Sequence, residues 1–334
     1  MTMLLLGSLL LSPRSATADN ASAAEHNHSV FQLSLQELMQ LPVSVRKRSE
    51  SIKDYPGSIT SISENEIFLL HADHFEDLSR QIPNYALGGI RGISTGSLNI
   101  AIEQPNNFYL DGAYLPKLAS NIDLVDLERV EVVRGPQGTY FGHNTMSGAI
   151  QYITRKPEAK NSYMLRGQLG NESHKSVKAV INQVLTDEIF TRISFSQKKA
   201  DGYYKNLYDG SDVNDTDELY GRFQLRFEPQ KESSINLSLD RQESETDSIL
   251  AMLRTPPDSD TANALAFWTL GTGLDPATIP TSSYQINQDQ VKHQETTNWG
   301  ANLTIEHQID PRHSLTSITS YRKSDRDRDS DDED

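Results

Sequence analysis

The fold of this chain is decided by residues 125–157, which read VDLERVEVVRGPQGTYFGHNTMSGAIQYITRKP. Valines that alternate with polar residues predict a strand over residues 129–134, after a short helix or turn. The GPQG of residues 135–138 predicts a turn, because proline fixes φ and glycine permits a positive φ. A second strand is predicted over residues 149–154. On these patterns alone, the unit could belong to any α/β domain.

The order of residues in this stretch, ERVEVVRGPQGT followed by G, N, SGAI and ITRKP, closely resembles the end of the plug domain in TonB-dependent outer-membrane receptors. An upstream IRG and an Asp-Gly pair before an aromatic residue fit the same pattern. The resemblance implies an α+β plug domain followed by antiparallel transmembrane β-strands, an incomplete portion of a 22-stranded β-barrel. The residues that match the plug motif are Gly92, Asp111, Gly112, Gly135, Pro136, Gly138 and Gly148.

Composition excludes several classes of function. The chain has 46 Asp and Glu against 31 Lys and Arg, and its net charge of −15 argues against a nucleic-acid partner. It has no cysteine, which excludes disulfides, thiolate metal sites and cysteine nucleophiles. The glycine-rich segments fit neither nucleotide-binding pattern, G-x-x-x-x-G-K-[ST] or G-x-G-x-x-G. We find no catalytic constellation and expect neither an enzyme nor a resident cofactor or metal.

The N-terminus has features of an exported chain. An apolar run over residues 4–11 and a small-residue pattern at residues 16–18 predict a signal peptide over residues 1–18. Residues 19–50 then form a predicted periplasmic linker. Where these receptors carry their TonB box, this chain has Leu41, Pro42, Val43, Ser44 and Val45. We expect this segment to be extended and unpaired, so that TonB can capture it by strand addition; the alternative is a linker strand without a partner.

Residues 51–157 are predicted to form the plug. The elements expected are a strand over residues 57–63, a helix capped by Ser63 and Glu66 with Ile67, Leu69 and Leu70 on its apolar side, a helix over residues 75–82, and strand segments over residues 90–93 and 108–115 with a turn at Asp111-Gly112.

Arginines at the positions of Arg91 and Arg134 lie at the plug–barrel boundary in this family, paired with barrel carboxylates. The resemblance implies the same joint here, with carboxylates that lie mostly beyond residue 334. Bidentate pairs suit such a joint, because they hold an orientation and can be exchanged for water. Ordinary surface arginines are one alternative, and local pairing with Glu128 and Glu131 is another.

From residue 162 onward the hydrophobic pattern has a period of two, which predicts strands of about 10 residues with one lipid-facing and one polar side. Residues 158–334 are therefore expected to hold the first barrel strands. The seven predicted strands are residues 162–170, 177–185, 189–197, 219–227, 235–240, 299–306 and 315–321. A soluble antiparallel sheet would alternate in the same way. However, the later connections are alternately short and long, which is typical of outer-membrane barrels.

The resemblance implies energised uptake of a scarce ligand, most often a ferric siderophore, across the outer membrane of a Gram-negative cell. The implied partners are TonB with its inner-membrane complex, outer-membrane lipid and the small-molecule ligand. Haem, cobalamin, nickel complexes and oligosaccharides remain possible ligands; a regulatory receptor and a soluble periplasmic plug-type binding module remain alternative functions. Seven strands cannot close such a barrel, so we expect a truncated chain that forms no working pore by itself. The acidic residues 324–334 are expected to be extracellular, as a charged loop or, alternatively, a calcium loop.

Overall fold

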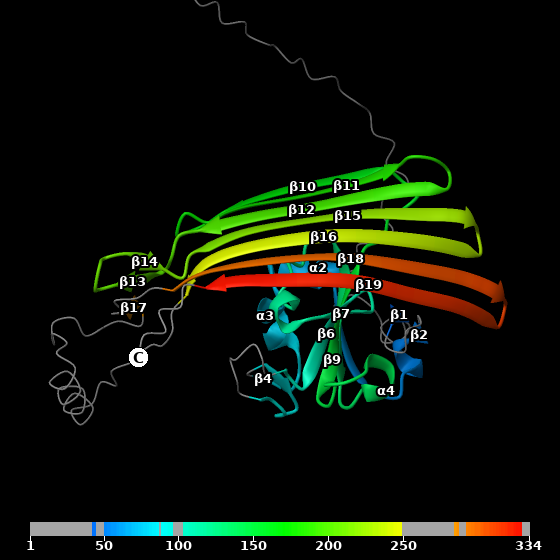
Figure 1. Cartoon of the computed structure of the whole chain (residues 1–334), viewed down its shortest axis with the longest axis horizontal. Coiled ribbons are helices and arrows are strands. Elements are labelled where there is room, and N and C mark those ends of the chain that lie inside the picture. Colours follow the sequence, from blue (N-terminus) through cyan, green and yellow to red (C-terminus); the bar gives the residue numbers. More distant parts are fainter. Residues whose placement is uncertain are drawn as a thin grey trace, which may run out of the picture.

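The computed structural model describes residues 42–44, 50–86, 88–95, 103–248, 284–286 and 292–328. These residues form a broad antiparallel sheet with a compact α+β domain packed against one of its faces (Figure 1). This arrangement confirms the predicted fold class, a plug followed by antiparallel strands that do not close on themselves. The predicted signal peptide and most of the predicted linker lie outside the described residues.

The plug is built on a five-stranded sheet whose strands are ordered β3-β8-β9-β6-β7. The pairing of β6 with β9 is parallel and the other pairings are antiparallel. Strands β8 and β9 are buried on both faces of the sheet. Consecutive residues of β8 are therefore buried, and the strand has no solvent-exposed side. The bounds are β3 Ser58–Ser63, β6 Asn106–Leu110, β7 Ala113–Leu115, β8 Leu127–Arg134 and β9 Gly148–Thr154.

Short helices cover this sheet, and none among the described residues is long and apolar enough to cross a membrane. They are α2 Glu64–Leu69, α3 Phe75–Leu78 and α4 Gly138–Phe141, with 3-10 turns η2 Ile52–Asp54, η3 Ser79–Gln81 and η4 Lys117–Ala119. The predicted capping box is confirmed: Ser63 N donates to the Glu66 carboxylate at 2.7 Å, and Glu66 N donates to Ser63 Oγ at 3.4 Å. The predicted apolar side is wrong for Leu69 and Leu70, which are 58% and 39% exposed, because so short a helix presents only Ile67 to the core.

Two other predictions about the plug need correction. The helix expected over residues 75–82 is α3 followed by η3, since the Ser79 hydroxyl donates to the Glu76 carbonyl at 2.5 Å and competes with the helical pattern. Residues 90–93 do not form one strand, because only Ile90 lies in a strand, and Arg91 and Gly92 have φ of +57° and +75° and form a turn. That turn follows a hairpin of β4 Tyr85–Ala86 and β5 Gly89–Ile90. The predicted Asp111-Gly112 turn is confirmed between β6 and β7, with φ of +48° and +81°.

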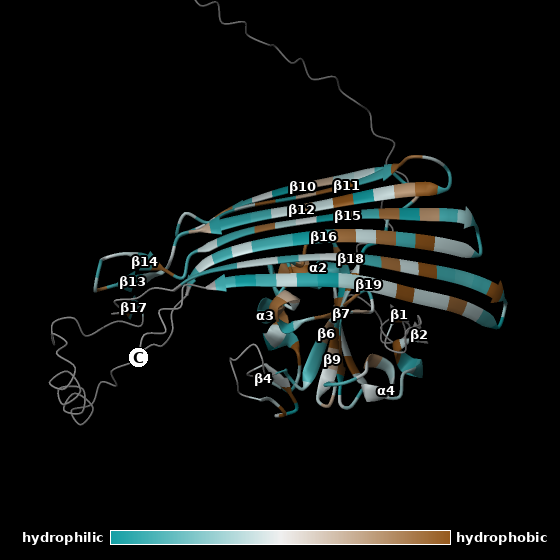
Figure 2. Ribbon diagram, in the orientation of Figure 1, coloured by the Kyte–Doolittle hydropathy of each residue, from teal (hydrophilic) through white to brown (hydrophobic). Residues whose placement is uncertain are grey.

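All seven predicted strands are present in one sheet, and consecutive strands pair antiparallel. Four of them run for 15 to 19 residues, longer than a bilayer crossing of about 10 residues requires. Hydrophobic residues recur on the parts near the short turns, whereas the ends near the long connections are hydrophilic (Figure 2). The strands are β10 Ser162–Leu169, β11 Lys175–Val184, β12 Ile189–Ala200, β15 Thr216–Gln230, β16 Ser233–Ser248, β18 Lys292–Asp310 and β19 His313–Arg328.

The turns after β11, β15 and β18 gather at one end of the sheet, whereas the short turn after β10 and the two long connections lie at the other (Figure 1). Parts of both long connections form a small sheet, in which β13 Tyr204–Asn206 pairs with β14 Asp212–Val213 and, in parallel, with β17 Gln285–Ile286. Residues 324–328 of the acidic segment extend β19, and the rest of that segment lies outside the described residues.

Candidate functional site

The predicted TonB box is docked on the plug. Pro42–Val43 forms strand β1 and pairs antiparallel with β2, Glu50–Ser51. The side chain of Val43 is fully buried in an apolar cluster that includes Tyr55 and Phe141. The expectation of an unpaired segment is therefore wrong for these residues, because apolar burial and a nearby strand edge hold them. Leu41 and Val45 lie outside the described residues.

Ser44, the next residue, is held at all of its polar groups by the plug. Its backbone N–H donates to both carboxylate oxygens of Glu131 at 3.0 Å. Arg129 Nη2 donates to its hydroxyl at 2.8 Å, and Gln151 Nε2 donates to its carbonyl oxygen at 3.3 Å. Glu131 and Gln151 are register partners on β8 and β9. We call Arg129, Glu131 and Gln151 the Ser44 site.

Glu131 is the buried centre of this site, with no exposed side-chain surface. Burial raises the pKa of Glu131, and Arg129, whose Nε lies 2.7 Å from the carboxylate, offsets only part of that effect. Arg129 also pairs with Glu128. Glu128 and Glu131 therefore pair with Arg129 and do not join the predicted arginine joint. Arg129 and Glu131 are two residues apart on β8 and share a face of the strand, whereas Glu131 and Arg134 are three residues apart and do not.

Arg91 and Arg134 have no carboxylate partner among the described residues. Arg134 donates to the carbonyl oxygens of Pro83 and Ile59 at 3.4 Å, and its Nε is buried without a partner. Burial and the nearby Arg91 lower the pKa of Arg134. Two close guanidinium groups favour an acidic counterpart, so their pairing with barrel carboxylates remains a prediction.

The plug-motif residues cluster at turns and at one strand end. Gly135 has a φ of +105°, and a Cβ there would stand 3.0 Å from Arg91 Nη1. At Gly148 a Cβ would lie 2.2 Å from the Val133 carbonyl oxygen, so only glycine lets β8 and β9 approach at this point. Gly92 lies in the turn after β5, Asp111 and Gly112 in the β6–β7 turn, and Pro136 and Gly138 between β8 and α4.

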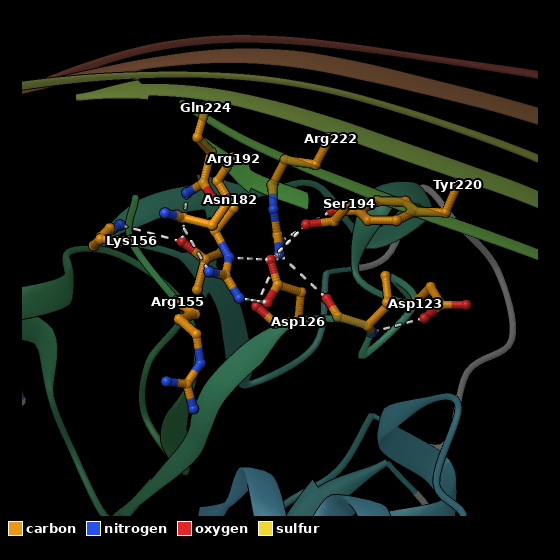
Figure 3. Close-up of polar contacts among 12 residues, drawn as sticks. Asp123, Asp126, Arg155, Lys156, Asn182, Arg192, Ser194, Tyr220, Arg222 and Gln224 are labelled. Carbon is orange, nitrogen blue, oxygen red and sulfur yellow. Dashed lines mark hydrogen bonds and ion pairs between the residues drawn. The ribbon is translucent and has the colours of Figure 1, made fainter. Parts of the chain in front are cut away.

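Asp111 ties its turn to the point where the chain leaves the plug. Its carboxylate accepts from Thr154 N at 3.0 Å and from Thr154 Oγ1 at 2.7 Å, and Lys156 Nζ lies 2.8 Å away. Burial opposes ionisation, but Lys156 and Thr154 outweigh it and lower the pKa of Asp111. From the strands, Gln224 Nε2 donates to Thr154 Oγ1 at 2.9 Å (Figure 3).

Asp126 is the centre of the contact between plug and strands (Figure 3). Its carboxylate accepts from Arg192 Nε at 2.8 Å and Nη2 at 2.5 Å, and from Ser194 Oγ at 2.5 Å. Arg222 Nη2 donates to the carbonyl oxygens of Asp126 and Val125 at 2.9 and 3.2 Å. Asp126 has a φ of +60°, which turns its carbonyl and carboxylate toward the strands. Because all these charged groups are buried, each depends on the others for its partners.

A second group of charges lies beside Asp126. Lys178 Nζ lies 2.6 Å from Asp73 and 3.5 Å from Asp123. His74 Nε2 lies 2.7 Å from a carboxylate oxygen of Glu218 and 2.9 Å from Lys198 Nζ. In this group, most of the acidic side chains come from the plug and most of the basic side chains come from the barrel strands.

The sequence did not reveal these pairs, although one signal was available. Lys178, Arg192 and Arg222 stand on the polar face of consecutive predicted strands, an unusual place for buried bases. Their partners on the plug are 55 or more residues away in the chain, so only the strand register and the plug position bring them together. In these pairs the strands supply the basic side chains, whereas in the predicted joint the plug supplies them.

The strands also carry an ion pair that crosses a strand. Arg322 on β19 donates two 2.8 Å hydrogen bonds to Asp240 on β16, across the intervening β18. Asp240 and Arg322 are both register partners of Gly300. A Cβ at Gly300 would stand 2.5 Å from Arg322 Nη2, so the glycine makes room for this contact. Within the described ranges, no group of three or more His, Asp or Glu side chains is placed to hold a metal ion.

Comparisons with known proteins agree with this architecture. Residues 51–149 match the family model described as TonB-dependent Receptor Plug Domain. The chain is 25% identical over 236 residues to the pesticin receptor of Yersinia enterocolitica, which covers 68% of the chain and 33% of that protein. It is 27% identical over 159 residues to the catecholate siderophore receptor Fiu of Escherichia coli K12, which covers 46% of the chain and 21% of that protein. The chain therefore spans a third or less of the length of these curated relatives.

Solved structures share the fold at lower sequence identity. The ferric yersiniabactin uptake receptor FyuA of Yersinia pestis superposes with a TM-score of 0.67 at 16% identity, covering 86% of this chain and 44% of that one. The siderophore receptor PiuA of Acinetobacter baumannii gives a TM-score of 0.66 at 16% identity, covering 88% and 40%. These relatives are receptors of the Gram-negative outer membrane and not enzymes. The chain thus carries a TonB-dependent receptor plug domain over residues 51–149, and its fold is similar to that of the plug domain and first barrel strands of such outer-membrane receptors.

Proposed function

We propose that the protein carrying this chain takes up a ferric siderophore across the outer membrane, driven by TonB. The observation that carries the proposal is the docked segment: Val43 and Ser44 bind the plug on the side of the short turns (Figure 1). In an outer-membrane barrel the short turns face the periplasm, where TonB acts. The printed names of several relatives, including a catecholate siderophore receptor and a ferric yersiniabactin uptake receptor, support an iron chelate as ligand.

In this proposal the plug couples its two ends. A chelate arrives on the side of the long connections, and the plug shifts against the ion pairs around Asp126. The Ser44 site then opens and β1 leaves β2, so the backbone of the segment becomes available for strand addition to TonB. The protein performs no covalent chemistry on the ligand.

A proline substitution tests the proposal. Val43→Pro in the full-length receptor removes the backbone N–H that strand addition requires, so we expect loss of ⁵⁵Fe-chelate uptake with chelate binding retained. Val43→Ala is the control, because it shortens the buried side chain and keeps the N–H. Uptake that survives Val43→Pro would place the TonB contact elsewhere, and uptake lost equally in both variants would show a packing effect.

Membrane fractionation separates this proposal from a soluble periplasmic binding module. The outward faces of the described strands carry exposed apolar residues, among them Tyr163, Leu165 and Leu169 at 69%, 79% and 86% exposure. We expect a surface of this kind to take the receptor into the outer-membrane pellet, whereas a soluble module would remain in the periplasmic fraction.

A further inference from the structure

A cavity of about 490 Å³ opens on the plug at the start of β6. Tyr85 and Gly88 of the β4–β5 hairpin line the cavity. In Figure 1, β4 lies on the opposite side of the plug from β1 and β2. The walls of the cavity include the partly buried rings of Tyr85, Phe108 and Tyr114. Cavities of this size, with apolar walls and a few polar groups, are typical of small-molecule sites.

One side chain in this cavity has no structural partner. Asn106 is only 2% exposed, yet neither its Oδ1 nor its Nδ2 has a hydrogen-bond partner among the described residues. The neighbouring Asn107 is also buried, but its Nδ2 donates to the His143 carbonyl oxygen at 2.8 Å. A buried amide without partners destabilises a fold. The fold therefore provides a hydrogen-bond partner for the buried amide of Asn107 but none for that of Asn106.

The chemistry of the cavity indicates which ligand group would form the missing hydrogen bonds of the Asn106 side chain. A carboxamide presents N–H donors and a carbonyl acceptor in one plane, and its complement is a planar group with the same pair, such as a secondary amide. Aromatic walls suit such a planar group. The charged lining residues are Glu76, Glu103 and Lys117, so carboxylates outnumber ammonium groups and an anion is disfavoured.

We propose that this cavity is a ligand subsite for an uncharged, amide-bearing part of the transported chelate, with Asn106 as its binding residue. The subsite rests on the proposed uptake function and adds to it a class of ligand. A polyanionic chelate without amides does not fit, because it meets Glu76 and Glu103 and leaves the Asn106 amide unpaired.

The first test separates a binding role of Asn106 from a structural one. Asn106→Leu keeps the side-chain volume and removes the unpaired polar atoms, so the thermal midpoint of the full-length receptor in detergent should rise. Asn107→Leu is the matched control and should lower the midpoint, because the His143 carbonyl loses its donor. A midpoint that falls in both variants would make Asn106 a structural residue and overturn the subsite.

The second test measures binding of two probes by calorimetry. Ferrioxamine B carries amides and a net positive charge, and the ferric tris(2,3-dihydroxybenzoate) complex is anionic and has no amide. We expect the receptor to prefer ferrioxamine B, and Asn106→Leu to weaken it about tenfold. Preference for the anionic complex, or unchanged affinity in Asn106→Leu, would overturn the subsite alone. Binding of neither chelate would overturn the proposed function together with its subsite.

Discussion

Asp126 is the residue on which the contact between plug and strands depends most. It satisfies Arg192 through its carboxylate and Arg222 through its carbonyl oxygen, and both guanidinium groups are buried. We expect Asp126→Asn to cost about 3–5 kcal/mol, because it leaves buried positive charge without compensation. Unfolding of the full-length receptor measures this, with the exposed turn variant Asp187→Asn as control. Equal stability of the two variants would contradict the role of Asp126.

His74 gives this contact a pH dependence. Burial disfavours protonation of His74, but the hydrogen bond to Glu218 outweighs it, so the pKa of His74 is raised above 6.5. The groups that face it are Glu218, Lys198, Asp73 and Asp123. A raised pKa means that the stabilisation is complete below 6.5 and is lost as the pH rises through the raised value.

We therefore expect His74→Gln to reduce the fall in stability as the pH rises above 6.5. The thermal midpoint measured against pH checks this. His307→Gln is the control, since His307 is exposed and the one hydrogen bond of its ring among the described residues is with the hydroxyl of Ser233. A wild-type slope retained in His74→Gln would show that another group titrates.

At the scale of elements, β8 and β9 hold the segment that carries Val43 and Ser44. We expect Glu131→Gln to weaken the Ser44 site, because it removes the ion pair with Arg129 and one of two acceptors. The periplasmic domain of TonB should then bind the ligand-free receptor about tenfold more tightly, since a larger fraction has the segment free. Glu128→Gln is the control, because Glu128 pairs with Arg129 and has no contact with Ser44. Equal affinity in both variants would show that Glu131 does not retain the segment.

Element by element, the sequence predicted what local chemistry dictates. The period of two located all seven strands, and the Ser63–Glu66 capping box and the Asp111-Gly112 turn were also predictable. The lengths of the four longest strands, β15, β16, β18 and β19, were not predictable, because the thickness of the bilayer does not limit a strand that continues into water. Residues 90–93 were mistaken for a strand because the positive φ of Arg91 has no sequence signal.

The candidate site was less predictable than the fold. The plug motif identified Asp111 and the tight glycines, since their roles are local. Docking of Val43 and Ser44 was not predictable, because it depends on a carboxylate 87 residues away that lies on a strand buried on both faces. The pairs around Asp126 depend likewise on the register between strands.

At the scale of the whole molecule, the plug connects two chemically different ends of the sheet. On one side lie the short turns and the docked segment, and on the other lie the long connections and the cavity of Asn106 (Figure 1). The ion pairs around Asp126 lie between them and hold the plug to the strands. We expect a change at one end to reach the other through β8 and β9, which are buried.

Hydrogen exchange at Val43 and Ser44 in the full-length receptor tests this coupling most directly. Without ligand, the amide of Ser44 should exchange slowly, because it donates to Glu131 and its neighbour is fully buried. With a bound ferric chelate, we predict that the protection of these two amides is lost while that of β8 is retained. Fast exchange without ligand, or protection that does not change when the chelate binds, would contradict a docked segment that the ligand releases.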